Sequence, residues 1–133
     1  MIGIDTNILV RLLVRDHDAQ VRAAEKFVTT HCTTTNPGFV SRVVIAELAW
    51  VLDDYYGYDR HEIAAALHGL RNVTQLKLDA AEAVEAALDD FVATSAEFAD
   101  CLIARLNRSA GCDFTATFDR KAAKLAGFRP LAT

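Results

Sequence analysis

The stretch MIGIDTNILVRLL, residues 1–13, decides how the fold begins. Its first four residues are apolar or glycine and lead into Asp5, a pattern typical of a short buried strand. From Ile8 to Leu13 the apolar side chains then recur at helical spacing, with Arg11 on the opposite face. A buried strand that passes directly into a helix favours a parallel sheet covered by helices.

The rest of the chain repeats this alternation. Short strands are predicted at 39–40, 73–78 and 113–118, and helices at 18–31, 41–55, 59–70, 79–93 and 94–109, with a last helix after Asp119 that ends at Gly127. We therefore expect an α/β fold with a short central parallel sheet of about four to five strands and helices on both faces. The length of 133 residues suits a single domain, residues 1–133.

Polar side chains stand where several of these helices are expected to begin, because such side chains satisfy the free N–H groups of a first turn. The expected N-caps are Ser41, Asp59, Asp79 and Asp119, and Thr94 and Glu97 have the spacing of a capping box.

The composition excludes several classes of protein. With 52% hydrophobic and 24% charged residues, the chain can form a core and is not disordered. No apolar stretch reaches the roughly 20 residues of a membrane span, and Asp5 interrupts what would have to be the apolar part of a signal peptide. Three widely spaced cysteines without a CxxC motif argue against a disulfide framework or a zinc knuckle. We expect a cytoplasmic protein without a membrane partner.

The net charge of −4 hides an uneven distribution. Residues 1–100 carry 8 basic and 16 acidic side chains, whereas residues 101–133 carry 6 basic and 2 acidic ones. A solvated basic tail and a surface that attracts phosphate both account for this asymmetry.

Four acidic residues occupy positions that are unfavourable for a lone charge. Asp5 and Asp119 each end an apolar strand, and Glu47 is the only charge between Val43 and Leu52, which predicts a half-buried carboxylate. Asp100 is the only charge within FADCLIA, residues 98–104. An ionised carboxylate in apolar surroundings is costly unless it is paired or binds a metal.

Each of the four also has a purely structural explanation. Asp5 and Asp119 can be N-caps, and Glu47 and Asp100 can form ion pairs. Taken together, however, acids that follow parallel strands meet at one edge of the sheet. A carboxylate cluster needs a counter-charge, and Mg²⁺ or Mn²⁺ prefers such oxygen ligands. This chemistry suits the hydrolysis of phosphodiester bonds.

These motifs carry a family resemblance. IDTN at 4–7, Glu47, FADCLIA at 98–104 and TFD at 117–119 together resemble a PIN domain, and their order and the chain length are similar to those of VapC toxins of VapBC toxin–antitoxin systems. The resemblance spans the whole chain. It implies a metal-dependent endoribonuclease that acts on RNA, works as a homodimer and is held inactive by a small cognate antitoxin.

The resemblance also implies roles for individual residues. The acidic quartet that would hold the metal and carry the catalysis corresponds to Asp5, Glu47, Asp100 and Asp119, and supporting polar positions correspond to Thr6, Asn7 and Thr117. The family often has Asp where this chain has Glu97. That side chain could supply a further metal ligand or complete the capping box with Thr94, and we expect the cap.

Other residues are expected to be structural. The four histidines, His17, His31, His61 and His68, fall outside the motifs and are predicted to lie on the surface. Cys101 is predicted to be a small core residue. The arginines Arg11, Arg15, Arg105, Arg108 and Arg120 could guide RNA, although any one of them is more simply solvated or ion-paired.

The same motifs are compatible with other functions. A PIN nuclease of RNA processing without a toxin role would have the same motifs. A Mg²⁺-binding receiver-like signalling domain also gathers acids at strand ends, but it needs an acidic pair after the first strand and a lysine after the last, and this sequence has neither. The expected position of Glu47 and Asp100 on helices also argues against it. A non-catalytic binding module would not require four acids.

Overall fold

The computed structural model describes residues 1–133, which form two compact units, Met1–Asp79 and Ala80–Thr133. The first unit contains β1 (Ile2–Gly3), α1 (Thr6–Val14), α2 (Asp18–His31), β2 (Gly38–Val40), α3 (Arg42–Asp54), α4 (Arg60–Arg71) and β3 (Leu76–Leu78). The second contains α5 (Ala81–Ala93), α6 (Phe98–Ser109), β4 (Thr115–Thr117), a short 3₁₀ helix (Ala122–Lys124) and β5 (Phe128–Pro130).

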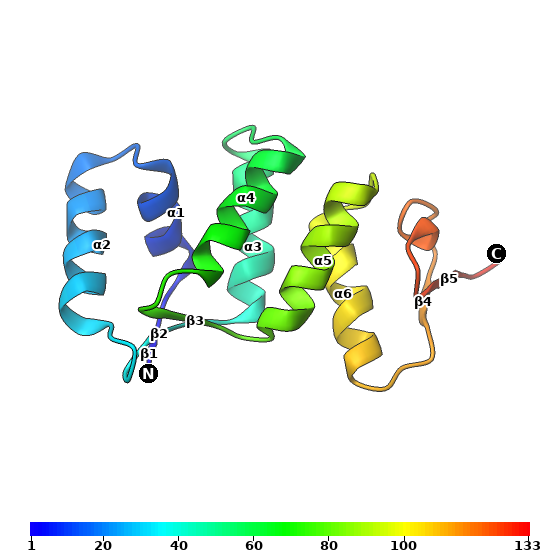
Figure 1. Cartoon of the computed structure of the whole chain (residues 1–133). Helices are drawn as coiled ribbons and strands as arrows, with labels where there is room; N and C mark the ends of the chain where they lie inside the picture. Colours follow the sequence, from blue (N-terminus) through cyan, green and yellow to red (C-terminus); the bar gives the residue numbers. More distant parts are fainter. The chain divides into compact units, whose positions relative to one another are not determined.

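The first unit is built on a parallel sheet with the strand order β1-β2-β3 (Figure 1). Because the strands are parallel, the residues that follow them lie at one edge of the sheet. These are Asp5 after β1, Ser41 after β2 and Asp79 after β3. Gly38 is required in β2, because a Cβ there would lie 2.9 Å from the Ile4 side chain and 3.0 Å from that of Leu76.

The helices of the first unit bury their apolar faces against one another. α1 packs against α2 and α3, α3 packs against α4, and α4 packs against β3. The largest side chains that are fully buried here come from α1, α3 and α4, among them Leu9, Ile45, Leu48, Leu52 and Leu67. This packing holds the start of α1 beside α3, which is where the first unit places its candidate site residues.

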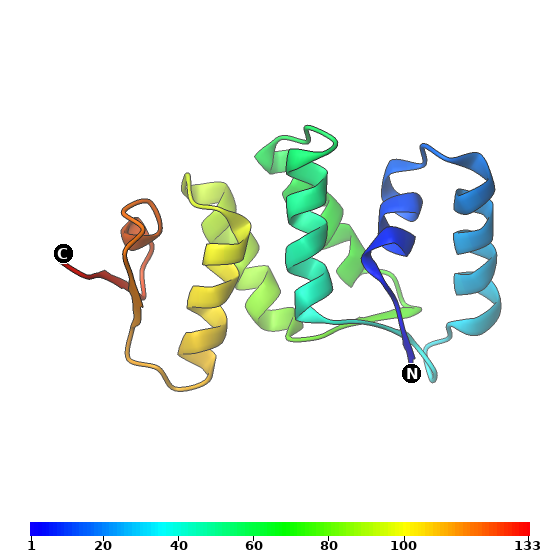
Figure 2. The same cartoon turned by 180° about the vertical axis from the view of Figure 1, so that it is seen from behind.

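The second unit is a helix pair followed by a two-stranded parallel sheet. α5 and α6 lie side by side (Figure 2). They are joined by an edge-to-face contact of Phe91 with Phe98 at 5.9 Å and by a bidentate ion pair of Arg105 with Asp90 at 2.7 and 2.8 Å. β4 pairs with β5, and the two connect through the 3₁₀ helix.

The expected α/β class and parallel pairing are confirmed. Five strands form, three in the sheet of the first unit and two in that of the second. The sequence pattern did not predict β5. The helix expected after Asp119 is a single 3₁₀ turn, and Gly127, with φ of 94°, leads from it into β5.

Two predicted caps are correct because they depend on neighbouring residues alone. The Ser41 hydroxyl accepts a hydrogen bond from the Val44 N–H, and Asp59 forms a capping box with Glu62 at the start of α4. All three cysteines are free, and Cys101 is fully buried, as expected.

Two other predicted caps are wrong. α5 begins after Ala80 without a side-chain cap, and Asp79 instead forms a bidentate ion pair with Arg42 at 2.8 and 3.2 Å. The Thr94 hydroxyl accepts from the Ala96 N–H and donates to the Asp90 carbonyl, so it is not available to α6. In both cases the side chain binds another partner, which is Arg42 for Asp79 and the Asp90 and Ala96 backbone for Thr94.

None of the six helices combines the length and the apolar character that a bilayer crossing requires.

Candidate functional site

Asp5 lies at the junction of β1 and α1. It is exposed, and its Oδ1 accepts a hydrogen bond from the Thr6 N–H at 2.7 Å. Asp5 is thus the N-cap of α1, as its structural explanation predicted. Its second oxygen makes no hydrogen bond within the protein, so capping α1 leaves Asp5 able to bind a ligand.

Glu47 lies on α3 and is exposed, so the prediction of a half-buried carboxylate is wrong. The physical reason is that α3 leaves apolar side chains exposed as well. Val43 and Trp50, which precede and follow Glu47 by about one turn, are 72% and 61% exposed. Apolar neighbours in the sequence therefore did not imply a buried face.

Asp5 and Glu47 line the same pocket, whose volume is about 350 Å³. Its lining also contains Thr6 and Asn7 from α1 and a group of further residues, Val10, Arg11, Val51, Tyr55 and Tyr56. Thr6 is only 5% exposed, and its hydroxyl oxygen is buried without a hydrogen-bond partner. Because a buried hydroxyl without a partner is costly, the pocket favours a ligand that the Thr6 hydroxyl can bind.

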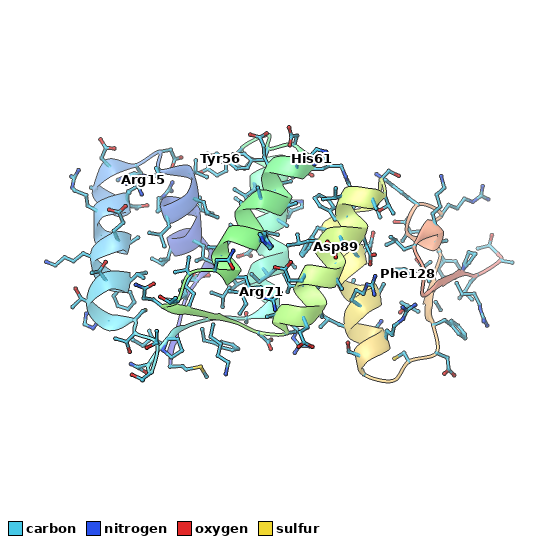
Figure 3. The ribbon with its side chains drawn as sticks, viewed as in Figure 1. Arg15, Tyr56, His61, Arg71, Asp89 and Phe128 are labelled. Carbon is cyan, nitrogen blue, oxygen red and sulfur yellow. The ribbon has the colours of Figure 1, made fainter.

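A hydrogen-bond network holds Arg11 at the edge of this pocket. The Arg11 Nε donates to Gln20 Oε1 at 2.6 Å, and its Nη1 donates to Asp16 Oδ1. The Tyr56 hydroxyl donates to the other oxygen of Asp16 at 3.0 Å and lies 3.5 Å from the Arg11 Nη1. In Figure 3, Tyr56 lies at the same end of the unit as Arg15.

The hydrogen bonds of this network shift the pKa values of Arg11, Asp16 and Tyr56. The hydrogen bond from Arg11 to Asp16 raises the pKa of the guanidinium. Desolvation alone would raise the pKa of Asp16, but the hydrogen bonds from Tyr56 and Arg11 outweigh it and lower that pKa. Desolvation and the bond to Asp16 raise the pKa of Tyr56. Each of these shifts moves the pKa further from neutral pH, so Arg11 stays protonated, Asp16 ionised and Tyr56 protonated across the physiological range.

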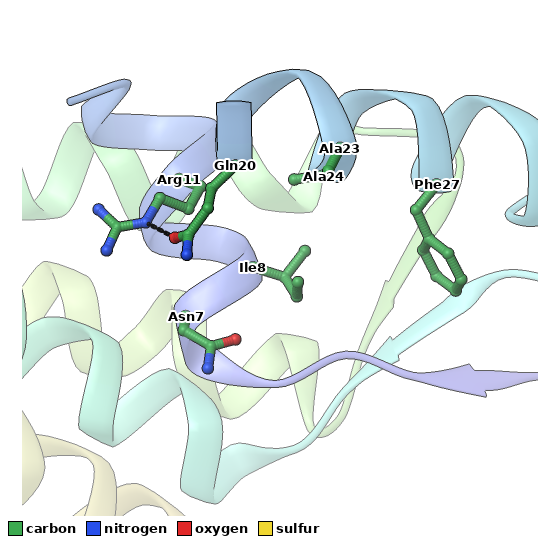
Figure 4. A pocket seen from close by; sticks show the side chains of 7 residues that line it. All are labelled: Asn7, Ile8, Arg11, Gln20, Ala23, Ala24 and Phe27. Atoms are coloured by element: carbon green, nitrogen blue, oxygen red, sulfur yellow. Dashed lines mark hydrogen bonds between the residues drawn. The ribbon is translucent and has the colours of Figure 1, made fainter. Parts of the chain in front are cut away.

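A second hollow of about 480 Å³ lies between α1 and α2 (Figure 4). Its walls are largely apolar, with Ile8 from α1 and Ala23, Ala24 and Phe27 from α2. Asn7 and Arg11 also line it, as they line the first pocket, so the two hollows are neighbours.

In the second unit, Asp100 lies in the first turn of α6 and is half-buried. Desolvation raises its pKa, and the negative charges of Asp119 and Glu97 raise it further, while Lys121 opposes the shift. The charges of Asp119 and Glu97 thus both act on Asp100. The motifs at 98–104 and 117–119 meet in this unit.

Asp119 closes the turn between β4 and the 3₁₀ helix. Its Oδ1 accepts hydrogen bonds from the Lys121 N–H at 2.8 Å and the Ala122 N–H at 3.3 Å. Thr117 supports it, because the Thr117 hydroxyl accepts from the Asp119 N–H at 3.0 Å. Asp119 therefore closes the turn that leads into the 3₁₀ helix, but the N-cap residue of that helix is Lys121, so the prediction that Asp119 caps a last helix is wrong. The other carboxylate oxygen of Asp119 makes no hydrogen bond.

Glu97 does not complete a capping box, so that expectation is wrong. It is the N-cap residue of α6, but its side chain makes no capping hydrogen bond. The side chain is 63% exposed and its carboxylate lies 3.9 Å from the Lys121 ammonium. The alternative use of Glu97 as an additional oxygen ligand therefore remains available to it.

The predicted residues thus form two groups, each within one unit. The first unit brings together Asp5, Thr6, Asn7 and Glu47, and the second brings together Glu97, Asp100, Thr117 and Asp119. Neither unit by itself gathers three or more His, Cys, Asp or Glu side chains into a metal-binding cluster. All four histidines are exposed, as predicted.

The sequence did not predict that Tyr55 and Tyr56 line the pocket, nor that Asp16 and Gln20 bind Arg11. A signal for Tyr55 was present, since it follows Glu47 by eight residues and therefore returns to the same helix face. Asp16 and Gln20 carry no comparable signal, because only the turn between α1 and α2 brings them to Arg11.

The residues of the first group fit a divalent cation. The donors are carboxylate oxygens, an amide and the unpartnered Thr6 hydroxyl, and hard cations such as Mg²⁺ and Mn²⁺ prefer oxygen ligands and retain several waters. Asp100 and Asp119 offer the same donor chemistry in the second unit, where desolvation first and then the charges of Asp119 and Glu97 raise the pKa of Asp100.

This raised pKa predicts the stability of an Asp100→Asn variant without metal. The pKa of Asp100 in the folded protein lies above the ordinary value of 3.8. Ionisation of this carboxyl as the pH rises past 3.8 therefore destabilises the folded state relative to the unfolded one. At pH 7 in EDTA, Asp100→Asn should therefore melt above wild type by roughly 1–3 °C, a small shift because the group is partly solvated. Well below pH 3.8 the difference should vanish, since the Asp100 carboxyl is then protonated in the folded and the unfolded protein and both side chains are neutral.

Thermal scans in EDTA and in Mg²⁺ check this expectation, with Asp113→Asn as a control at an exposed acid of the same unit. In Mg²⁺ the variant should lose most of the stabilisation seen in wild type, because a ligand stabilises in proportion to its binding to the folded state. A lower melting temperature for Asp100→Asn in EDTA at pH 7 would instead mean that Asp100 is a paired structural residue.

The comparison with protein families covers almost the whole chain. Residues 2–128 match the PIN domain, and the match includes all eight predicted site residues. A search of curated proteins finds none that matches the chain. A match of this extent removes the receiver-like alternative. The chain belongs to the PIN domain family, whose members are generally nucleases.

Proposed function

We propose that this chain is a metal-dependent endoribonuclease that hydrolyses phosphodiester bonds of RNA. The observation that carries the proposal is the pocket in which Asp5 and Glu47 lie beside the buried, unpartnered hydroxyl of Thr6. A buried hydroxyl without a hydrogen-bond partner is unfavourable, and the two exposed carboxylates beside it are oxygen ligands. A hydrated divalent cation and a substrate phosphate would satisfy both.

In this proposal Asp5, Glu47, Asp100 and Asp119 hold Mg²⁺ or Mn²⁺ and serve the same reaction. A bound cation of this kind lowers the pKa of water and neutralises charge on a phosphate. Thr6 and Asn7 would orient the groups in the pocket of the first unit, and Thr117 orients Asp119 through its backbone N–H. We also propose that residues 1–133 work as one nuclease domain, since one family match runs through both units.

The test is a cleavage assay on total RNA with Mg²⁺, in which the cut ends are mapped. We expect discrete internal ends with wild type and none with Asp5→Asn. That substitution removes the charge but should leave the start of α1 intact, because Asn is as good an N-cap as Asp and keeps an acceptor for the Thr6 N–H. Ends that accumulate equally with Asp5→Asn would reject a nuclease role for the pocket.

We further propose that the protein is the toxin of a toxin–antitoxin pair. The excess of acidic residues between 1 and 100 supports a partner with a basic segment. The apolar hollow between α1 and α2 supports the same idea, because apolar side chains of that partner would fit beside Ile8, Ala24 and Phe27. A small DNA-binding protein encoded next to this gene should bind the purified chain and stop RNA cleavage. A neighbour-encoded protein without effect on cleavage would favour a role in RNA processing.

The protein is expected to be a homodimer. The support comes from α3, which leaves Val43 and Trp50 largely exposed, since exposed apolar faces mark protein contacts. Light scattering at micromolar concentration should report twice the 14.6 kDa of one chain. Trp50→Lys should shift the mass toward one chain. Monomer alone across the micromolar range for wild type would count against the dimer.

A further inference from the structure

An aromatic side chain stands at the edge of the pocket that contains Asp5 and Glu47. Tyr55 follows the last turn of α3 and is 77% exposed. It lies four residues after Val51 and eight after Glu47, a spacing that places all three on one helix face, and all three line the pocket. An exposed aromatic ring therefore lies beside a candidate acid on the same helix.

Tyr55 is held in place. Its backbone N–H donates to the Val51 carbonyl at 3.0 Å, and its ring meets the Tyr56 ring edge-to-face, with centroids 4.8 Å apart and an interplanar angle of 71°. Tyr56 is itself anchored, because its hydroxyl donates to Asp16 at 3.0 Å. An edge-to-face contact covers at most one face of Tyr55, so the other face stays open.

Asp16, which anchors Tyr56, also binds the positively charged side chain of Arg11. Arg11 is the only cationic side chain in the lining of the pocket. Gln20 and Asp16 bind its Nε and Nη1, whereas its Nη2 group has no partner. A guanidinium whose position is set by two bonds, and which keeps a free N–H edge, is suited to contact a phosphate.

A flat open ring and a cation beside two carboxylates match a nucleotide with an unpaired base. We propose that Tyr55 stacks on one base of the bound RNA while Arg11 contacts the adjoining phosphate. This inference rests on the proposed nuclease function and adds a substrate-positioning subsite to it. Because stacking is tolerant of base identity, the subsite selects single-stranded or looped RNA over duplex without selecting a particular base.

A binding experiment tests the stacking without any cleavage. Short single-stranded RNAs that carry the fluorescent base 2-aminopurine at successive positions are titrated with Asp5→Asn protein in Mg²⁺. We expect quenching at one position. Adding Tyr55→Leu should remove that quenching and weaken binding roughly tenfold, whereas adding Tyr55→Phe should preserve both, since base–aromatic stacking needs only the ring.

The matched control is Tyr58→Leu, which removes the same kind of side chain three residues further along but outside the pocket lining. It should keep wild-type quenching and affinity. Circular dichroism and melting temperature establish that each variant is folded. Quenching of equal size with and without the Tyr55 ring would overturn the proposal.

Kinetics separate this inference from the function on which it rests. In the active protein, Tyr55→Leu should raise KM about tenfold with little change in kcat, and an RNA that is abasic at the quenched position should abolish the difference from wild type. If Asp5→Asn stops cleavage while Tyr55→Leu has the KM and quenching of wild type, only the stacking proposal fails. If wild type cleaves no RNA, the nuclease proposal fails, and the quenching result still decides the stacking.

Discussion

Asp5→Asn and Asp100→Asn are each expected to lower kcat/KM for RNA cleavage by at least about a hundredfold, because each removes a charge that the proposed cation and the reaction need. The two residues lie in different units and in different motifs. Asp5 lines the pocket of the first unit, and Asp100 interacts with Asp119 in the second. Initial rates over a range of RNA concentrations measure both effects.

The double variant distinguishes a shared role from two separate ones. Residues that act as a unit have effects that do not add, so Asp5→Asn with Asp100→Asn should be about as inactive as either single variant. A double variant with the product of the two single losses would mean that the acids serve independent steps. Asp113→Asn, at an exposed acid of the second unit, should cleave as wild type does.

Metal removal is the second large effect. Cleavage should stop in EDTA and return when Mg²⁺ or Mn²⁺ is added in excess of the chelator, whereas Zn²⁺ should not restore it. The reason is the donor set, in which carboxylate, hydroxyl and amide oxygens are present while cysteine and histidine are not. Rates in each metal, with wild type and Asp5→Asn side by side, make the measurement. Full activity in EDTA would contradict a metal-dependent mechanism.

The local features of the fold were predictable from the sequence. Ser41 and Asp59 cap helices as expected, because an N-cap depends on the three or four residues that follow it. The apolar periodicity located the helices well, and α2, Asp18–His31, has the predicted bounds. Asp5 and Asp119 stand at strand ends as predicted, since a strand that stops at an acid is also a local pattern.

Features that depend on distant partners were not predictable. Asp79 was expected to cap α5 but pairs with Arg42, which is 37 residues away in the sequence. The C-terminal strand β5 was missed, because three residues without clear alternation become a strand only through pairing with β4. Periodicity does not report such pairings.

In the candidate site, too, some features were predictable from the sequence and others were not. The sequence by itself indicated which acids to propose as the site, since Asp5, Glu47, Asp100 and Asp119 are lone charges within or after apolar stretches and stand in the motifs that resemble a PIN domain. Only the tertiary structure decided what surrounds them: the exposure of Glu47, the unpartnered Thr6 hydroxyl, and the network that carries Arg11 and Tyr56 to the edge of the pocket. The physical reason is that residue identity sets what a group can bind, while burial and hydrogen-bond partners arise from segments that meet only when the chain is folded.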